Sequence, residues 1–188
     1  MDAMTLTRAD VIVREGPYTR AELDALPDDG RRHELLDGVL VMTPAPGIRH
    51  QGIVLTLASL LKSHAPRACT VLIAATDVVL GPGTVLEPDV VVARRADVTE
   101  RDVPTAPLLA VEVLSPSTGL FDLGRKLELL EQAGCPSYWT VDPAGPELTV
   151  RELVDGRYVV TARVGPDDTW TADAPYPVAI TPRDLLDD

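Results

Sequence analysis

The chain has 188 residues and a formal net charge of -12, with 45% hydrophobic and 24% charged residues. This composition is typical of a folded globular protein, and the length favours one domain over residues 1–188, with 1–15 as a loosely attached arm. The negative charge disfavours a protein that coats nucleic acid, although it allows a local site. No apolar run could span a bilayer and no leader pattern opens the chain, so we expect a cytoplasmic protein without a membrane partner.

The first half of the chain predicts a short helix, a hairpin and a longer helix. Thr19 and Glu22 have the spacing of a capping box, which indicates a helix that ends near residue 26. An Asp-Gly dipeptide between two apolar runs predicts a hairpin over residues 32–42. Apolar residues recur at helical spacing from His50 to His64, so we expect an amphipathic helix there.

The second half of the chain predicts mostly strands. They are expected near residues 70–75, 77–80, 89–93, 108–113, 137–141, 148–152 and 158–164, before a proline-rich tail. A helix over about 120–133 separates the fourth of these strands from the fifth, and this connection is long enough for a parallel crossover. The fold class is therefore α/β, bordering on α+β, with a mixed β-sheet flanked by helices, an additional N-terminal hairpin and C-terminal strands.

Two carboxylates lie in strands that are otherwise suited to burial. Asp89 opens one apolar run and Glu112 stands inside another. A buried carboxylate is costly unless a cation or hydrogen-bond donors meet it, so two of them suggest a shared divalent metal. Oxygen ligands favour Mg²⁺ or Mn²⁺ over zinc. The alternatives are a turn aspartate at Asp89 and an edge-strand acid paired with an arginine at Glu112.

Lysine and cysteine are both rare in this sequence. Of the 17 basic residues only Lys62 and Lys126 are lysine, a compact charge suited to a site with phosphate and water. Lys126 falls in the helix predicted after Glu112, where an ordinary solvent-exposed position is the alternative. Cys69 and Cys135 are too few and too far apart for a disulfide framework or a zinc site, so we expect small buried thiols.

An ordered set of motifs resembles the Uma-two family, a branch of the PD-(D/E)XK nuclease superfamily. The motifs are Glu34-Leu-Leu-Asp-Gly, His50-Gln51, Pro88-Asp89-Val-Val-Val, Glu112-Val-Leu-Ser-Pro-Ser, Asp122, Lys126 and Tyr138-Trp139. The resemblance runs from about Pro17 to Trp170. It implies a restriction-endonuclease-like core and a metal-dependent phosphodiesterase site, with Asp89 and Glu112 as the metal-binding acids.

The resemblance also implies where the remaining site residues lie. The superfamily pattern has a lysine two residues after the second acid, where this chain has Leu114, so the lysine has moved to the following helix and Lys126 is the candidate. Glu34 is a third candidate acid, with an exposed strand residue as the alternative. The accessory candidates are His50, at a helix start near phosphate or simply exposed, and Asp122, near the metal or only complementing the helix dipole.

These residues predict a Mg²⁺- or Mn²⁺-dependent endonuclease that hydrolyses phosphodiester bonds in DNA and works as a homodimer. Asp89 and Glu112 would hold the metal, and Lys126 would position the attacking water or neutralise developing charge. Two other functions stay open. One is a catalytically silent nuclease-fold interaction module, which the acidic net charge favours, and the other is a metal-dependent hydrolase of small phosphoesters.

Overall fold

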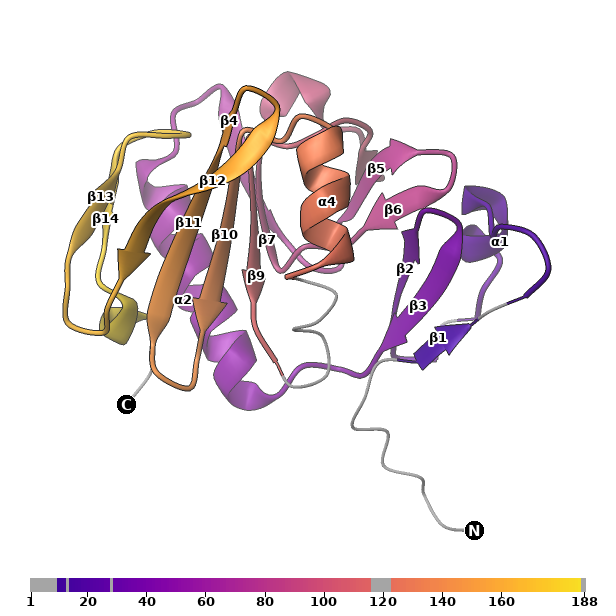
Figure 1. Cartoon of the computed structure of the whole chain (residues 1–188), viewed down its shortest axis with the longest axis horizontal. Coiled ribbons are helices and arrows are strands. Elements are labelled where there is room, and N and C mark those ends of the chain that lie inside the picture. The colour runs from indigo at the N-terminus through magenta and orange to yellow at the C-terminus, as the bar shows by residue number, and fades with distance from the viewer. Residues whose placement is uncertain (1–9, 13, 28, 116–122, 187–188) are drawn as a thin grey trace, which may run out of the picture.

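The computed structural model describes residues 10–12, 14–27, 29–115 and 123–186. Strands predominate and helices are few in this part of the chain, so the class is mixed α+β (Figure 1). In chain order the elements are β1 (Asp10–Ile12), α1 (Arg20–Asp24), β2 (Arg32–Leu36), β3 (Val39–Thr43), α2 (Ile48–His64), β4 (Cys69–Ile73), β5 (Asp77–Gly81), β6 (Thr84–Leu86), β7 (Val90–Arg94), η1 (Arg95–Asp97), β8 (Asp102–Val103), β9 (Leu109–Val113), α4 (Arg125–Gln132), β10 (Ser137–Asp142), β11 (Glu147–Val154), β12 (Arg157–Val164), β13 (Trp170–Ala172), β14 (Val178–Ile180) and η2 (Pro182–Leu185).

The first six-stranded sheet, here called sheet A, has the order β1-β3-β2-β6-β5-β8. It contains the predicted hairpin, which turns at Asp37 and Gly38 with φ angles of 56° and 80°. A Cβ atom at Gly38 would lie 2.5 Å from Cβ of Pro17, so both the turn and this close approach require glycine. The described part of the predicted N-terminal arm is β1, which pairs with β3.

The second six-stranded sheet, sheet B, has the order β12-β11-β10-β9-β7-β4. β9 and β10 are parallel and the chain between them includes α4, as the sequence predicts, whereas the other neighbours in this sheet are antiparallel. The predicted helix over 120–133 begins at Arg125 in the described chain, after a turn at Leu123 and Gly124, and it ends at Gln132. Residues 116–122 lie outside the described ranges.

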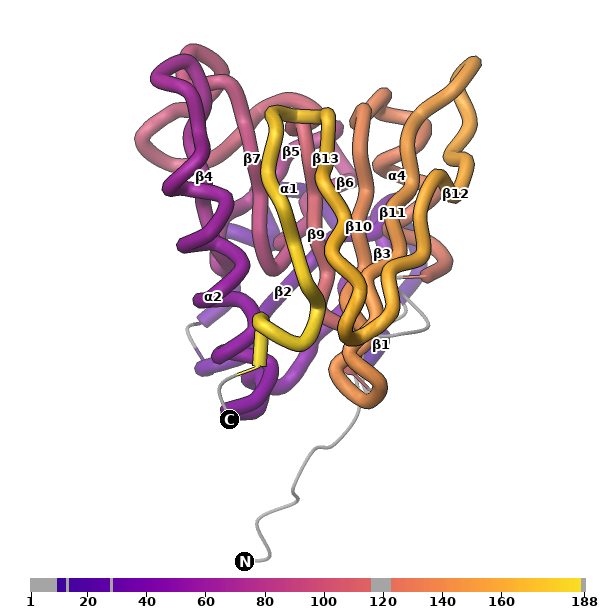
Figure 2. Tube along the Cα trace, turned by 90° about the vertical axis from the view of Figure 1, so that its left-hand side faces the viewer, coloured from indigo at the N-terminus to yellow at the C-terminus, as the bar shows by residue number. Residues whose placement is uncertain are grey.

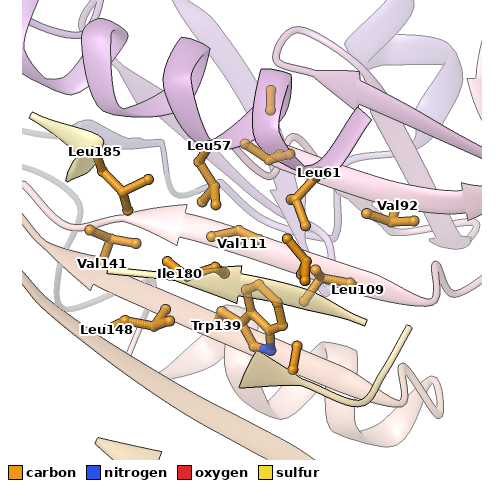
Figure 3. Close-up of a cluster of buried hydrophobic side chains, with 14 of the residues drawn as sticks. Leu57, Leu61, Val92, Leu109, Val111, Trp139, Val141, Leu148, Ile180 and Leu185 are labelled. Carbon is orange, nitrogen blue, oxygen red and sulfur yellow. The ribbon is translucent and has the colours of Figure 1, made fainter. Parts of the chain in front are cut away.

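One face of sheet B packs against α2 and the β13–β14 hairpin, which lie side by side in Figure 2. Side chains alternate along a strand, so alternate residues of β7, β9 and β10 point to this face. The buried apolar residues among them are Val90, Val92, Leu109, Val111, Val113, Trp139 and Val141. Figure 3 shows the resulting core, in which Leu57 and Leu61 of α2 pack near Val111 and Trp139. The rings of Trp139 and Trp170 meet edge to face, 5.5 Å apart.

The other face of sheet B packs against sheet A and α4. Here Ala110 of β9 and Tyr138 of β10 contact Leu129 and Leu130 of α4 together with Leu86 of sheet A. Asp89 and Glu112 belong to this side, since their neighbours along the strand, Val90 and Val111, point to α2. The two sheets and α4 therefore enclose the predicted site.

Two other expectations can be compared with the described chain. Cys69 and Cys135 are free and buried, as predicted, and burial raises the pKa of the Cys135 thiol to about 11. Within the described ranges, no helix combines the length and the apolar character needed to cross a bilayer.

Candidate active site

Asp89 and Glu112 lie opposite each other where β7 begins and β9 ends. Val90 of β7 pairs with Val111 of β9 in antiparallel register, and the two acids are the next residues along each strand. Asp89 is 2% exposed and Glu112 is 1% exposed. Both line a pocket of about 210 Å³. The structure thus brings the two predicted metal ligands to one small cavity.

Three groups contact the carboxylate of Asp89. Arg32 Nη1 donates to Oδ1 at 2.8 Å, the Val113 N–H donates to Oδ2 at 2.7 Å, and His50 Nε2 lies 3.0 Å from Oδ2. Burial alone would raise the pKa of Asp89, but the hydrogen bond with His50 and the charge of Arg32 outweigh it and hold the pKa below its usual range. Asp89 is therefore ionised at neutral pH. His50, an accessory candidate, is at the site.

Lys126 connects the acids of the two sheets. Its Nζ lies 2.9 Å from Oε2 of Glu34 in β2 and donates to Oε1 of Glu112 at 3.1 Å. Lys126 is 2% exposed, so the interpretation as a solvent-exposed helix position is wrong. In α4 it shares its helix face with the buried Leu129 and Leu130, which follow it by three and four residues. The ammonium group thus reaches Glu112 although position 114 is leucine.

Glu34 is 1% exposed, so it is not the exposed strand residue that was the alternative. Its Oε1 accepts a hydrogen bond from the Glu87 N–H at 2.7 Å. This bond fixes the chain just before Asp89 against β2. Asp122, the remaining accessory candidate, lies outside the described residues.

The sequence prediction missed two residues of the site, Arg32 and Glu87. Arg32 donates to Asp89 and to the backbone carbonyl of Glu87, and its Nε lies 3.5 Å from Glu87 Oε2. Burial raises the pKa of Glu87 to about 7, although the charge of Arg32 opposes this. Arg32 precedes Glu34 by two residues and Glu87 precedes Asp89 by two. Residues two apart along an extended chain point to the same side, so this spacing could have identified both Arg32 and Glu87 as neighbours of the site acids.

The charges of the site leave a negative excess that suits a divalent cation. Four buried acids, Glu34, Glu87, Asp89 and Glu112, face two basic side chains, Arg32 and Lys126. If both basic groups carry a positive charge and three of the acids are ionised, one negative charge is unbalanced, and ionisation of Glu87, whose pKa is about 7, adds a second. In the described chain no group of three or more His, Cys, Asp or Glu side chains is placed to hold a metal ion. Two carboxylates with water and backbone oxygen still fit Mg²⁺, which usually takes few protein ligands.

A second, larger pocket of about 1120 Å³ adjoins the first. Both are lined by Arg32, Pro46, His50 and Asp89. The N-terminus of α2 lies at this junction. Its N-cap residue is Gly47, so no side chain caps the first backbone N–H groups of the helix, and the first turn contains no acid. Such a helix end favours negative charge.

The sequence matches one family model. The family model for Uma2, described as "Putative restriction endonuclease", matches residues 20–184. The chain belongs to the Uma2 family. No curated protein matches the sequence.

A solved structure supports the fold of this Uma2 protein. The crystal structure described as "a putative nuclease belonging to DUF820", from Anabaena variabilis ATCC 29413, is similar to it with a TM-score of 0.72 and 20% sequence identity. The match covers 90% of this chain and 97% of the other. The predicted nuclease-type core is therefore confirmed at the level of the fold.

Proposed function

We propose that this Uma2 protein is a Mg²⁺- or Mn²⁺-dependent endonuclease that hydrolyses phosphodiester bonds in DNA. The observation that carries the proposal is the buried cluster of four acids and two cations around a cavity of about 210 Å³. Structural ion pairs rarely need four buried carboxylates, because each one is costly to remove from water. Asp89 and Glu112 are the proposed metal ligands.

The side chains around the cavity suggest a division of roles. A divalent ion held by Asp89 and Glu112 would favour hydroxide over water and offset charge on the phosphate. Lys126, which contacts Glu34 and Glu112, would hold a water or a phosphate oxygen. Nδ1 of His50 is buried without a hydrogen-bond partner among the described residues, and His50 lines both pockets. With Nε2–H donating to Asp89, Nδ1 of the neutral ring would accept a hydrogen bond from a water bound in the cavity.

The local charge supports a polyanionic substrate in spite of the net charge of -12. Residues 38–76 contain no Asp or Glu, and Arg49 of this segment stands next to His50 at the start of α2. This segment contains α2, whose N-terminus lies at the site. The nearby surface thus differs in sign from the chain as a whole, so a phosphate backbone can approach the site from the side of α2.

Calorimetric titration with Mn²⁺ tests the metal assignment directly. The variants Asp89→Asn and Glu112→Gln should each bind Mn²⁺ at least about tenfold more weakly than the parent, since a hard cation loses a charged ligand. Glu100→Gln, which changes an exposed acid outside the site, is the control and should bind as the parent does. If both site variants bind Mn²⁺ as tightly as the parent does, Asp89 and Glu112 are not the metal ligands.

The same proteins should be assayed for cleavage of single- and double-stranded DNA. Cleavage that requires Mn²⁺ or Mg²⁺ and fails in Asp89→Asn is the expected result. The catalytically silent interaction module is the second candidate function. It is favoured by the contacts of Arg32, His50 and the Val113 N–H with both carboxylate oxygens of Asp89, which would otherwise bind a metal. Metal-independent stability together with no cleavage of any phosphodiester would favour that module.

A further inference from the structure

We infer that the larger pocket is a groove for unpaired nucleic acid, which holds the bases next to the phosphate that lies at Asp89. The inference rests on the proposed function and adds the form of the substrate, a single strand or an unpaired segment. It is carried by the apolar wall of the groove, by its charge and by its continuity with the smaller cavity.

The wall of the groove carries large apolar side chains that face solvent. Ile48 is 91% exposed, Leu55 is 62% exposed and Ile73 is 47% exposed, and all three line the pocket. Ile48 and Leu55 are seven residues apart on α2, so they lie on one side of the helix, and Ile73 ends β4. Exposed apolar side chains gathered in a pocket indicate a surface that binds an apolar group.

The charge of the groove selects an anionic occupant. Among the residues that the structure describes, Asp89 is the only acid that lines it, whereas Arg32 and Arg49 are both present. Arg49 is exposed and makes no ion pair with a described residue. An apolar surface beside a free guanidinium matches a nucleotide, which joins an apolar base face to a phosphate.

The apolar wall also favours the binding of unpaired strands over duplex. In a duplex the base faces are stacked inside, and a protein meets phosphates, sugars and base edges. An unpaired base presents its face to an apolar wall. The pocket of about 1120 Å³ is larger than the roughly 300–1,000 Å³ that small ligands use, so it has room for more than one nucleotide.

Continuity between the two pockets sets the position of the strand. Arg32, His50 and Asp89 line both. A base in the groove therefore places its neighbouring phosphate at the smaller cavity, beside the acids and Lys126. This arrangement predicts that the scissile bond adjoins the bound, unpaired bases.

Binding without cleavage is the appropriate test, so it is done in EDTA by fluorescence anisotropy. The probe is a labelled oligodeoxynucleotide of about 20 nucleotides, longer than the roughly 4–16 nucleotides that one groove covers, used single-stranded and annealed to its complement. The parent should bind the single strand at least about tenfold more tightly than the duplex. Equal or tighter binding of the duplex would overturn the inference.

Two exposed side chains of the wall can be changed with little risk to folding. The double variant Ile48→Ser with Leu55→Ser should bind the single strand about tenfold more weakly than the parent, because two apolar side chains no longer cover the bases. Val159→Ser is the matched control, because Val159 is 47% exposed on β12, at the opposite edge of sheet B from β4. It should bind as the parent does. Unchanged affinity of the double variant would overturn the inference.

The role of Arg49 is tested by Arg49→Ala against Arg67→Ala, which removes the same charge beyond the C-terminal end of α2. Arg49→Ala should weaken binding of the single strand more, and the difference should shrink at high salt. Equal effects of the two variants would count against the groove.

Sedimentation velocity of the same variants distinguishes the rival occupant, a second copy of the chain. If the double variant loses a dimer while its oligonucleotide affinity is unchanged, the groove is a self-association surface and the inference is wrong. The outcomes are also separate from those for cleavage. Groove-dependent binding without cleavage would remove the nuclease proposal alone, and cleavage without groove-dependent binding would remove this inference alone.

Discussion

Lys126 is the residue on which the electrostatics of the site depend most directly. It lies between two carboxylates that are each about 1% exposed, and its Nζ contacts Glu34 at 2.9 Å and Glu112 at 3.1 Å. Breaking a buried ion pair by removing one partner typically costs about 3–5 kcal/mol, because it leaves an uncompensated buried charge.

The variant Lys126→Met retains much of the apolar stem and deletes the charge. We expect its free energy of unfolding without metal to fall by about 3–5 kcal/mol, and its rate of DNA cleavage to fall on the order of 100-fold or more. Urea unfolding and single-turnover cleavage in Mn²⁺ measure the two effects. Lys62→Met, on an exposed position of α2, should change stability by less than about 0.5 kcal/mol.

A second substitution separates stability from chemistry in this variant. Glu34→Gln added to Lys126→Met removes one of the two stranded charges, so it should restore part of the stability. It should not restore cleavage, since the ammonium group is still absent. Restoration of both would mean that Lys126 has only a structural role.

Among the elements, α1 has the clearest local determinant. Glu22 Oε2 accepts from the Thr19 N–H at 2.9 Å, and the Thr19 side chain accepts from the Glu22 N–H, which completes the predicted capping box. The hydrogen bond with Arg14, followed by those with Thr19, lowers the pKa of Glu22 from 4.5 to about 2.

This lowered pKa predicts how α1 responds to acid. A carboxyl group with a depressed pKa in the folded state contributes its full stability above its ordinary pKa of 4.5 and loses that contribution as the pH falls through about 2. The Thr19 amide signal in NMR spectra should therefore titrate in this range in the parent and not in Glu22→Gln. Thr19→Ala should destabilise α1 by about 1 kcal/mol. Identical acid titration of the Thr19 signal in parent and Glu22→Gln would contradict the cap.

Elements with local signals were predictable from the sequence, and elements defined by distant pairing were not. The capping box, the Asp-Gly turn and the helical spacing of α2 each depend on residues close in the chain. β6 (Thr84–Leu86) and β8 (Asp102–Val103) are too short to carry a pattern. β6 is a strand because it pairs with β2 and β5, and β8 because it pairs with β5. The division into two sheets also depends on such long-range pairing, so the sequence indicated a mixed sheet without assigning each strand to a sheet.

The same distinction explains the candidate site. Asp89 and Glu112 stand out as acids within apolar runs, and the family resemblance supplied Glu34 and Lys126. Arg32 precedes its strand's apolar part and resembles an exposed residue in the sequence. Its burial is a consequence of sheet A packing on sheet B, which no local pattern records.

At the scale of the whole molecule, we propose that the protein is a two-fold homodimer, since one site cuts one strand and two-fold pairs are the commonest soluble oligomer. Sedimentation velocity at tens of micromolar, roughly the range for modest interfaces, should therefore give the mass of a dimer. A monomer at that concentration would remove the proposal.

The position of the site between the two sheets has a kinetic consequence. Arg32 and Asp89 are 57 residues apart, and Glu34 and the Glu87 amide are 53 apart. Such contacts close long loops, so we expect them to form late on the folding pathway, after the transition state. Glu34→Gln should then accelerate unfolding much more than it slows refolding in stopped-flow urea experiments. Slower refolding with little change in the unfolding rate would instead place the contact in the transition state. If the contact does form late, the residues proposed to cut DNA also set the lifetime of the folded protein.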